Sequence, residues 1–454
     1  MASTLLDGKI VVAGAGISGI GTARLLQSLD AQFELVDASA AALERAEGIP
    51  TALIGSDTLD GVALLVTSPG WRPDSPLLVE AQQRGIPVIG DVELAYRLDR
   101  DGAFGQPRTW MVVTGTNGKT TTTAMLAAMM QAGGFEAQAV GNIGVSIAEA
   151  LLGERVDVLV AELSSFQLHW APTLVPDVGV LLNLADDHID WHGSFEAYAQ
   201  AKAKVLAAPV HIAGIEDPAV AELADDRTIG FRLEAPQANE LGVRDGMLVS
   251  RAFGDSNLVL AQTEGIQPPG PAGIADALAA AAAARSQGVS AEAIASALEG
   301  FQVAGHRGQT VENEGGVLAV DNSKATNPHA ADAALAGFES IIWIAGGQLK
   351  GASVEELVRT HAHRIKAAAL LGVDREEIAS VLREYAPDAE IMCTASTDPD
   401  KAMGEVVGFA LSRYEQSDAI VLAPAAASLD MYTSMAQRGD LFAYYIQALT
   451  KSAR

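Results

Sequence analysis

Cysteine is almost absent from this sequence of 454 residues. Cys393 is its one cysteine, so the chain cannot contain a disulfide framework. A protein without disulfides suits a reducing compartment, and the opening residues lack the pattern of a secretory signal peptide. We therefore expect a cytoplasmic protein.

Positive charge is also scarce. Lys and Arg together number 30 against 57 Asp and Glu, which gives a formal net charge of −27. Nucleic acids and anionic membrane surfaces both require a basic footprint on the protein. The charge balance therefore argues against both as partners. If the substrates are anionic, the few cations must be concentrated where those substrates bind.

Long apolar runs are the third thing this sequence lacks. The longest run, Ala277–Ala284, is mostly alanine. It is far shorter than the roughly 20 apolar residues that a membrane-spanning helix needs. We therefore expect no membrane insertion.

Apolar residues nevertheless make up 49% of the chain, enough for a buried core in each of several domains. A chain of this length exceeds the size of one core. A polar, glycine-bearing stretch between about Leu98 and Gln106 has no periodicity and is predicted to be a linker. We predict three domains, at residues 1–98, 99–304 and 305–454.

The first domain opens with a strand, a glycine turn and a helix. Lys9–Ala13 is predicted to be a strand, Ile20–Leu29 a helix and Phe33–Val36 a second strand that ends at Asp37. The turn between the first strand and the helix reads G-x-G-x-x-G, which in dinucleotide-binding folds holds a diphosphate at the helix N-terminus. The alternative is a turn that serves only close helix–strand packing. A further strand, Val62–Val66, leads to a loop at the same sheet edge.

The second domain opens with the stretch around which the chain is organised. Thr109–Val113 is predicted to be a buried strand, and Thr121–Gln131 a helix. The residues between them are Thr114-Gly115-Thr116-Asn117-Gly118-Lys119-Thr120. Backbone N–H groups at such a turn converge on phosphate oxygens, and the lysine adds a full positive charge. The spacing departs from GxxxxGK[ST], because Val113 stands where the first glycine would fall. We predict a nucleoside triphosphate site; the alternative is a Thr-rich turn before an Ala-rich helix.

Three polar clusters follow later strands of this domain, which are predicted at Ala137–Val140, Val158–Glu162 and Val178–Asn183. The clusters are Gly141–Gly144, Glu162–Gln167 and Asp186–His188. Polar residues directly after parallel strands converge on one sheet edge, here the edge of the phosphate loop. The Asp245-Gly246 pair predicts a hairpin, which we expect to form a small antiparallel flap.

The third domain begins after Gly305 and is also predicted to be α/β. A hairpin is expected around Gly315-Gly316, and helical patterns separate the strands. The predicted strands are Val317–Val320, Ile341–Ala345, Ala367–Leu371 and Ala419–Leu422.

With these motifs in order, the chain resembles the Mur ligases, the ATP-dependent amide-forming enzymes of peptidoglycan precursor synthesis. Further motifs that carry the resemblance are His306-Arg307, Asn322–Asn327 and Ala427–Asp430. Within this family, the stretches Glu162–Leu168 and Ser323–Asn327 resemble the corresponding motifs of the members that add D-glutamate. The resemblance implies a Rossmann-like first domain, a central P-loop-type ATPase domain with a mostly parallel sheet, and a Rossmann-like α/β third domain.

The resemblance also implies the reaction. The L-alanyl carboxylate of UDP-N-acetylmuramoyl-L-alanine takes the γ-phosphate of ATP, and the D-glutamate amine then displaces phosphate from the acyl phosphate. Lys119, Glu162, His188 and Lys202 are the expected catalytic residues. Two Mg²⁺ are expected, one held by Thr120 and Glu162 and one by His188 and Lys202. For the second ion, Lys202 is expected to be modified to N6-carboxylysine. Without the resemblance, Lys202 would be interpreted as a solvated helix lysine and His188 as structural.

The remaining site residues follow from the same resemblance. ATP is expected to contact the phosphate loop and four residues outside it; the full set is Thr116, Asn117, Gly118, Lys119, Thr120, Thr121, Asp276, Arg307, Asn322 and Lys324. The UDP-linked substrate is expected to contact Ile17, Ser18, Asp37, Ser68, Gly70, Asn142, Ser164 and His188. D-Glutamate is expected to contact Lys324, Thr326, Lys350, Ser428 and Leu429. The expected partners are these three small molecules, and the protein is expected to be a monomer.

Three other functions stay open. The same chemistry could act on L-glutamate or L-alanine, and a relative could bind nucleotide without catalysis. The glycine turn at Gly14–Gly19 alone would suit a nicotinamide oxidoreductase, but the phosphate loop would then have no use.

Overall fold

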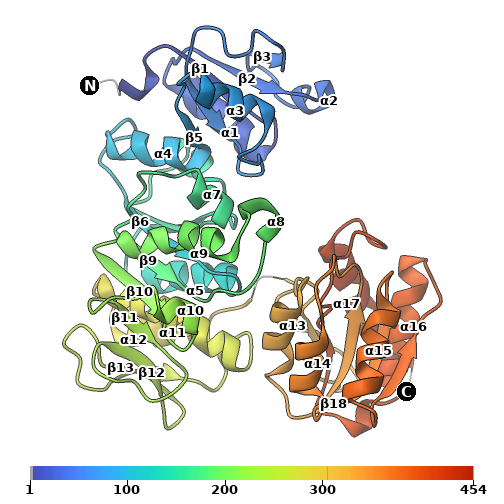
Figure 1. Cartoon of the computed structure of the whole chain (residues 1–454). Coiled ribbons are helices and arrows are strands. Elements are labelled where there is room, and N and C mark those ends of the chain that lie inside the picture. Colours follow the sequence, from blue (N-terminus) through green and yellow to red (C-terminus); the bar gives the residue numbers. More distant parts are fainter. Residues whose placement is uncertain (1–3, 304, 453–454) are drawn as a thin grey trace. The chain divides into compact units, whose positions relative to one another are not determined.

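The computed structural model describes residues 4–303 and 305–452, which form two compact units (Figure 1). The first unit contains residues 1–261 and 276–297, and the second contains residues 262–275 and 298–454. The divisions between the units fall inside strand β14 (Leu258–Gln262) and inside helices α11 (Pro271–Ser286) and α12 (Ala291–Glu299). The predicted boundaries of three domains stay a prediction, although residue 98 lies inside helix α4 (Asp91–Arg100).

The first unit holds two sheets. The five-stranded sheet has the order β3-β2-β1-β4-β5 and is parallel. Its strands are β1 (Lys9–Ala13), β2 (Phe33–Asp37), β3 (Thr51–Leu53), β4 (Val62–Thr67) and β5 (Val88–Gly90). The nine-stranded sheet has the order β14-β13-β12-β11-β10-β9-β6-β8-β7. Its strands are β6 (Thr109–Thr114), β7 (Ala137–Gly141), β8 (Val158–Glu162), β9 (Val178–Leu181), β10 (Val210–Gly214), β11 (Ile229–Phe231), β12 (Glu240–Arg244), β13 (Met247–Ser250) and β14 (Leu258–Gln262).

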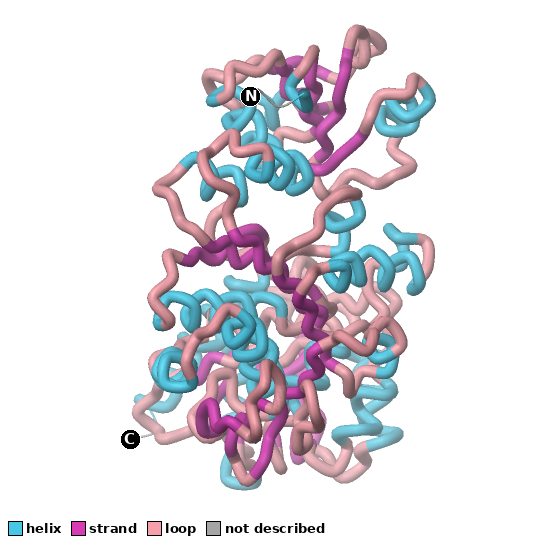
Figure 2. Tube along the Cα trace, turned by 90° about the vertical axis from the view of Figure 1, so that its left-hand side faces the viewer, coloured by secondary structure: helices cyan, strands magenta, loops and turns pink. Residues whose placement is uncertain are grey.

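Helices pack on these sheets. Figure 2 shows helices beside the strands of the nine-stranded sheet, which is called the central sheet below. Those of the first unit, besides α4, are α1 (Ile17–Ser28), α2 (Ala40–Leu43), α3 (Pro76–Gln83), α5 (Lys119–Ala132), α6 (Ile147–Leu152), α7 (Ser165–His169), α8 (Ile189–His192), α9 (Phe195–Ala203) and α10 (Pro218–Ala221), with 3₁₀ turns at Thr4–Leu6 and Lys204–Ala207. Among the described residues, no helix combines the length and the apolar character that crossing a bilayer would need.

The second unit is a six-stranded sheet with the order β15-β16-β20-β17-β18-β19. Only the β15–β16 pair is antiparallel among these pairings. The strands are β15 (Gln309–Thr310), β16 (Ala319–Asp321), β17 (Ile341–Gly346), β18 (Ile365–Leu371), β19 (Glu390–Cys393) and β20 (Ala419–Leu422). The helices are α13 (Pro328–Leu335), α14 (Glu355–His361), α15 (Arg375–Tyr385), α16 (Pro399–Leu411) and α17 (Met435–Ser452), with a 3₁₀ turn at Tyr414–Gln416.

Strand burial explains why the strands are apolar throughout. In β17, Ile341 and Trp343 pack into one core, while Ile342 and Ile344 pack into the core on the opposite face. Successive side chains of a strand point to opposite faces, so a sheet covered on both sides needs apolar residues at every position. The predicted mostly parallel α/β architecture is confirmed.

Several local predictions require correction. Helix α1 begins at Ile17, three residues before the predicted start, because the glycine turn itself supplies the first helical turn. The polar stretch after Leu98 begins inside α4, which continues to Arg100. Strand β16 lies at Ala319–Asp321 rather than at Val317–Val320. Strand β19 was not predicted.

The Asp245-Gly246 hairpin is confirmed, but it is not a separate flap. Both residues have positive φ, 52° and 72°, as a two-residue turn between twisted strands requires. Strand β12 pairs parallel with β11 and antiparallel with β13, so the hairpin extends the central sheet.

Candidate active site

The phosphate loop lies between helix α5 and strand β6, which is flanked by β9 and β8 in the central sheet. Gly118 has φ of 81°, a left-handed conformation that favours glycine, and α5 begins at the next residue. A Cβ at Gly118 would lie 2.2 Å from Oδ1 of Asp276, so the backbone and this carboxylate are in close contact. The loop therefore presents the N-terminus of a 14-residue helix at the carboxyl end of a buried strand.

Neighbouring strands hold this loop in shape. The Asn117 N–H donates to Oδ1 of Asn183 at 2.8 Å, and Nδ2 of Asn183 donates to the Asn117 carbonyl at 3.2 Å. The hydroxyls of Thr116 and Tyr198 are hydrogen bonded at 2.7 Å. These contacts satisfy polar atoms behind the loop and tie it to the neighbouring strand β9 and helix α9. Sequence reasoning missed this role of Asn183, although it is a polar residue two positions after the end of strand β9.

Lys119 folds back over the loop. Its Nζ donates to the carbonyls of Gly115 at 3.0 Å and Thr116 at 2.8 Å, and the side chain is half-buried. The ammonium group is thus held at the helix N-terminus, where an anion would be stabilised by both the helix dipole and the charge.

Thr120 and Glu162 are brought together as predicted. The Thr120 hydroxyl donates to Oε2 of Glu162 at 2.6 Å, and the two residues are only 4% and 5% exposed. Mg²⁺ prefers oxygen ligands and keeps several waters, so it is usually bound by one or two protein groups together with substrate phosphates. A hydroxyl beside a buried carboxylate at a phosphate loop fits that ion.

Lys202 is buried directly behind the same loop. It is 2% exposed, and its Nζ donates to the Gly115 carbonyl at 2.7 Å and to the Thr114 hydroxyl at 3.3 Å. The ammonium also lies 5.0 Å from the ring centroid of Tyr198. Burial, reinforced by the charge of Lys119, holds the pKa of Lys202 well below its ordinary value. The interpretation as a solvated helix lysine is wrong, because this side chain is enclosed.

His188 lies in an aromatic cluster at the start of α8. Its side chain is 47% exposed, its backbone is left-handed, and its ring centroid lies 4.7 Å from that of Phe166. Nearby, burial lowers the pKa of His192 to about 4, with smaller contributions from the neighbouring His169 and His188. Within the part of the chain that the structure describes, no three His, Cys, Asp or Glu side chains form a ready-made metal cage. A pairing of His188 with Lys202 at a metal stays a prediction.

The first glycine turn is closed by Asp37, at the end of β2. Its Oδ2 accepts from the Ala15 N–H and its Oδ1 from the Ser39 N–H, both at 2.8 Å. Ser68 donates its hydroxyl to the Gly14 carbonyl at 3.2 Å. Asp37 and Ser68 therefore lie at the turn as predicted, and their recorded contacts are to backbone groups. The exposed Gly70 follows in the same loop.

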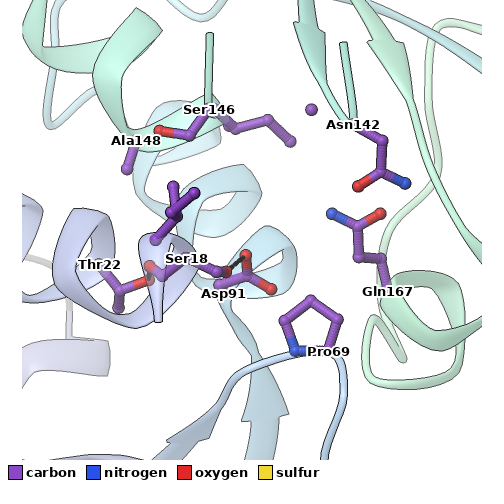
Figure 3. A pocket seen from close by; sticks show the side chains of 11 residues that line it. Ser18, Thr22, Pro69, Asp91, Asn142, Ser146, Ala148 and Gln167 are labelled. Carbon is purple, nitrogen blue, oxygen red and sulfur yellow. Dashed lines mark hydrogen bonds between the residues drawn. The ribbon is translucent and has the colours of Figure 1, made fainter. Parts of the chain in front are cut away.

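A cavity of about 250 Å³ lies beside this turn (Figure 3). Its lining comes from two stretches of the first unit, residues 17–91 and residues 141–167. The lining residues are Ile17, Ser18, Thr22, Pro69, Asp91, Gly141, Asn142, Ser146, Ile147, Ala148 and Gln167. Ile17 is 83% exposed, so an apolar side chain stands uncovered at its edge. Figure 3 shows the amide groups of Asn142 and Gln167 facing each other across the cavity. Three predicted substrate residues, Ile17, Ser18 and Asn142, thus share one hollow.

Asp91 is a cavity residue that sequence reasoning missed. It begins α4 directly after strand β5, and it accepts a hydrogen bond from the Ser18 hydroxyl. Its other oxygen, Oδ1, is buried without a hydrogen-bond partner in the structure. Burial raises the pKa of Asp91, and the Ser18 hydrogen bond opposes that rise. The signal available in the sequence was the one used elsewhere, a polar residue following an apolar strand.

Ser164 has a structural task. Its hydroxyl accepts from the Gln167 N–H, and the Gln167 side chain accepts from the Ser164 N–H, which is a capping box at the start of α7.

Asp276 is 8% exposed, and its Oδ1 accepts from the Thr122 hydroxyl at 3.1 Å. Its predicted contact with adenine stays a prediction. Thr121, 8% exposed, lies in the first turn of α5.

The other predicted residues belong to the second unit. Asn322, Lys324 and Thr326 follow β16, Lys350 follows β17, and Ser428 and Leu429 follow β20. These three strands are neighbours in the sheet and parallel, so the residues gather at one sheet edge. Lys324 and Lys350 are exposed, Ser428 is 4% exposed and Leu429 is 70% exposed. Arg307 is half-buried near β15.

Comparison with known families matches each part of this architecture. Residues 8–90 match the MurD-like N-terminal domain of Mur ligases, residues 113–244 the Mur ligase middle domain, and residues 306–426 the glutamate ligase domain of Mur ligases. The three matches follow one another along the chain in the order in which they are named here. The chain belongs to the Mur ligase family.

Particular members are similar over nearly the whole chain. A UDP-N-acetylmuramoylalanine--D-glutamate ligase of Corynebacterium diphtheriae is 60% identical, covering 96% of this chain and 95% of its own length. A protein of the same name from Mycolicibacterium smegmatis is 44% identical, covering 97% of this chain and 96% of its own.

Solved structures agree in fold. UDP-N-acetylmuramate-alanine ligase from Thermotoga maritima has a TM-score of 0.59 at 19% identity, covering 99% of this chain and 100% of its own. A pseudomurein peptide ligase type C from Methanothermus fervidus has the same TM-score at 16% identity, with the same coverage. At such identities the likeness shows the fold alone.

Proposed function

We propose that this protein joins D-glutamate to UDP-N-acetylmuramoyl-L-alanine, consuming ATP and releasing ADP and phosphate, in peptidoglycan precursor synthesis. The observation that carries the proposal is the phosphate loop with Lys119 above it and the buried Thr120–Glu162 pair beside it. The D-glutamate specificity is supported by the name of relatives up to 60% identical over 96% of the chain.

The first step brings two anions together. An oxygen of the L-alanyl carboxylate attacks the γ-phosphorus, the bond to the β-phosphate oxygen breaks, and ADP leaves. Lys119 lies at the loop where that charge develops, and the loop N–H groups add their dipoles. The D-glutamate amine then attacks the acyl carbon, loses a proton, and phosphate leaves.

Bound Mg²⁺ would neutralise charge on the phosphate oxygens. Thr120 and Glu162 would hold one ion. His188 would help to hold a second, together with Lys202 if that lysine carries a carbamate. Only the neutral amine reacts with CO₂, forming an N–C bond and losing a proton. Burial of Lys202 favours that neutral form, which supports the carbamate.

The cavity beside the first glycine turn would hold part of the UDP-linked substrate. The N–H groups at the N-terminus of α1 and the Ser18 hydroxyl, once it turns from Asp91, would donate to the diphosphate. As the resemblance implies, Asp37, Ser68 and Gly70 would also contact the uracil and diphosphate part of the substrate. Asn142 would orient the peptide end of the substrate, and its side chain lies in the cavity wall. Ser164 would act mainly by holding α7 in place, because its hydroxyl accepts the cap hydrogen bond.

The second unit would supply the amino-acid site. Lys324, Thr326, Lys350 and Ser428 offer two cations and two hydroxyls, which suit a dicarboxylate. Leu429 would add an exposed apolar contact. Arg307, Asn322 and Lys324 would also reach ATP, and closure on binding would keep water from the acyl phosphate.

The protein would act as a monomer. ATP and a UDP-linked substrate support a cytoplasmic reaction. Light scattering of the purified protein tests the first point; a mass of twice the chain's 47.0 kDa would contradict it.

The deciding experiment measures phosphate release with ATP, Mg²⁺ and UDP-N-acetylmuramoyl-L-alanine, with D-glutamate, L-glutamate and L-alanine in parallel. Release only with D-glutamate, together with a new UDP-linked product, is expected. Release with another amino acid would keep the chemistry and change the specificity. No release with any of them would favour a nucleotide-binding relative without catalysis.

A further inference from the structure

Arg438 lies in the first turn of α17 and is completely buried. Its Nη1 donates to the carbonyls of Gly346 at 3.1 Å and Ala426 at 3.2 Å. Its Nη2 donates to the carbonyls of Ser323 at 2.8 Å and Ala426 at 3.2 Å. One side chain thus binds three loops that are distant in the sequence.

Those three loops carry the residues assigned to D-glutamate and two of the residues assigned to ATP, Asn322 and Lys324. Ser323 follows β16, Gly346 ends β17, and Ala426 follows β20. The strands lie side by side in the order β16-β20-β17, so Arg438 crosses the carboxyl edge of the sheet. The loop after β16 carries Lys324, and the loop after β17 carries Lys350.

A guanidinium group is suited to this task. Its N–H donors form a rigid planar fork, whereas a lysine ammonium is one point on a flexible stem. The hydrogen bonds recorded for Arg438 go to carbonyl oxygens. Burial lowers its pKa to about 10, so it remains protonated near neutral pH, with Asp430 and Asp321 favouring the charged form.

The next residue, Gly439, brings α17 against the same edge. A Cβ at Gly439 would lie 2.1 Å from Nδ1 of His306, and 2.5 Å from both Oδ2 of Asp321 and Oγ of Ser323. Helix α17 therefore approaches the β16 loop as closely as a glycine permits. His306 and Asp321 are themselves hydrogen bonded at 2.7 Å.

Two of the loops, those after β17 and β20, contain residues in an unfavourable backbone conformation. Lys350 and Ala425 have positive φ, 54° and 58°, a region that side chains with a Cβ rarely adopt. Gln348 and Ala427 exchange two backbone hydrogen bonds of 2.9 Å, which tie two of the loops to each other. Such conformations persist only where the surroundings determine them.

We propose that Arg438 is a positioning residue that sets the loops after β16, β17 and β20 in the geometry that binds the amino acid and the nucleotide. The proposal rests on the proposed ligase function for its kinetic consequences. Its structural consequence, the ordering of three loops by one side chain, does not depend on that function.

The test compares Arg438→Lys with the wild-type full-length chain. We expect kcat/KM for D-glutamate to fall by about 10- to 100-fold, because a displacement near 1 Å is enough for such a loss. The KM for UDP-N-acetylmuramoyl-L-alanine should change less than about twofold, since its assigned residues belong to the first unit. Hydrogen–deuterium exchange should accelerate in residues 322–327, 346–351 and 425–430.

Arg364→Lys is the matched control. Arg364 also donates to backbone carbonyls, those of Phe338 and Ala336, but it lies at the amino end of β18 in the same sheet. We expect it to lower thermal stability without raising the KM for D-glutamate. If both variants behave alike, Arg438 has a general structural role and the proposal is wrong.

A second variant covers the case in which Arg438→Lys does not fold. Gly439→Ala keeps the arginine but pushes α17 away from His306, Asp321 and Ser323, so it should change the same readouts. Unchanged exchange in the three loops of a folded variant would overturn the proposal. An inactive wild-type protein would instead refute the ligase function, while the exchange experiment would still test the role of Arg438.

Discussion

Two glycine turns of the first unit share a backbone plan and differ in their side chains. Each joins a buried parallel strand to the N-terminus of a helix, with a left-handed glycine, Gly14 in one and Gly118 in the other. The phosphate loop has Lys119 over it, Lys202 behind it, and the Thr120–Glu162 pair beside it. The first turn instead has the Ser18 hydroxyl, which donates a hydrogen bond to the carboxyl group of Asp91.

The buried ionisable groups at the two turns have opposite signs. Burial raises the pKa of Asp91 at the first turn and lowers that of Lys202 at the phosphate loop, so both are driven toward neutrality. A glycine turn therefore offers a place for phosphate groups, while the surrounding side chains select which phosphate-bearing ligand binds there. Cations and a metal-binding pair suit a triphosphate that reacts; a hydroxyl and a carboxyl suit a diphosphate-linked substrate that is only held.

The largest effect that this comparison predicts comes from Lys119→Ala. Removing the charge where two anions meet should cost about 2.7–4 kcal/mol of transition-state stabilisation, or about 100- to 1,000-fold in kcat. Phosphate release measures it, with Lys9→Ala as the control, since Lys9 pairs with Glu34 on the first sheet. Unchanged turnover in Lys119→Ala would contradict the phosphate-loop assignment.

Lys202→Ala should also reduce phosphate release severely, and short carboxylates such as acetate should restore part of it if the lysine acts as a carbamate. Lys204→Ala is the matched control, because Lys204 lies two residues away and donates to the Leu168 carbonyl at 2.7 Å. Any loss in that variant should not respond to acetate. If no carboxylate concentration restores Lys202→Ala, the carbamate is refuted.

Ser18→Ala should have a smaller and more selective effect. Loss of a hydrogen bond to a charged ligand costs about 1.5–3 kcal/mol, so the KM for the UDP-linked substrate should rise about 10-fold or more, with kcat and the KM for ATP little changed. The control is Ser28→Ala, at the other end of α1, where the hydroxyl donates to the Leu25 carbonyl at 2.7 Å. An equal change in the KM for ATP would show that the two turns do not act separately.

The smallest expected effect is a pH dependence at Asp91. A carboxyl whose pKa is raised in the folded state binds its proton more tightly there, so stability falls as pH rises from its ordinary pKa of 3.8 through the raised value. Asp91→Asn lacks this dependence. Its melting temperature relative to wild type should therefore increase between about pH 4 and pH 7. A constant difference over that range would show that burial does not raise the pKa of Asp91.

Much of the fold could be predicted because its signals are local. Strands β1, β8 and β20 lie at the predicted residues, since an apolar run between turn residues is visible within a few positions. The Asp245-Gly246 turn was identified by its two residues alone. Boundaries were less certain: α1 starts three residues early, because a glycine turn can also be the first turn of a helix.

The candidate site was predicted where residues lie near the carboxyl ends of parallel strands. Glu162 ends β8, and Thr120 lies in the first turn of α5, just after the loop that follows β6. Their meeting follows from the rule that parallel strands end at one edge. The state of Lys202 did not follow from it. Burial depends on how α9 packs against the loop, and no local pattern distinguishes an enclosed lysine from a solvated one.

The class of fold, the two glycine turns and the types of charged residue available to each follow from the sequence alone, because these depend on neighbours along the chain. Which distant groups meet depends on tertiary packing: Ser18 with Asp91 across 73 residues, Gly115 with Lys202 across 87, and Ser323 with Arg438 across 115. Pairings at such separations form when whole elements pack. Packing also sets burial, and burial is what shifts the pKa values of Asp91 and Lys202 away from their ordinary values.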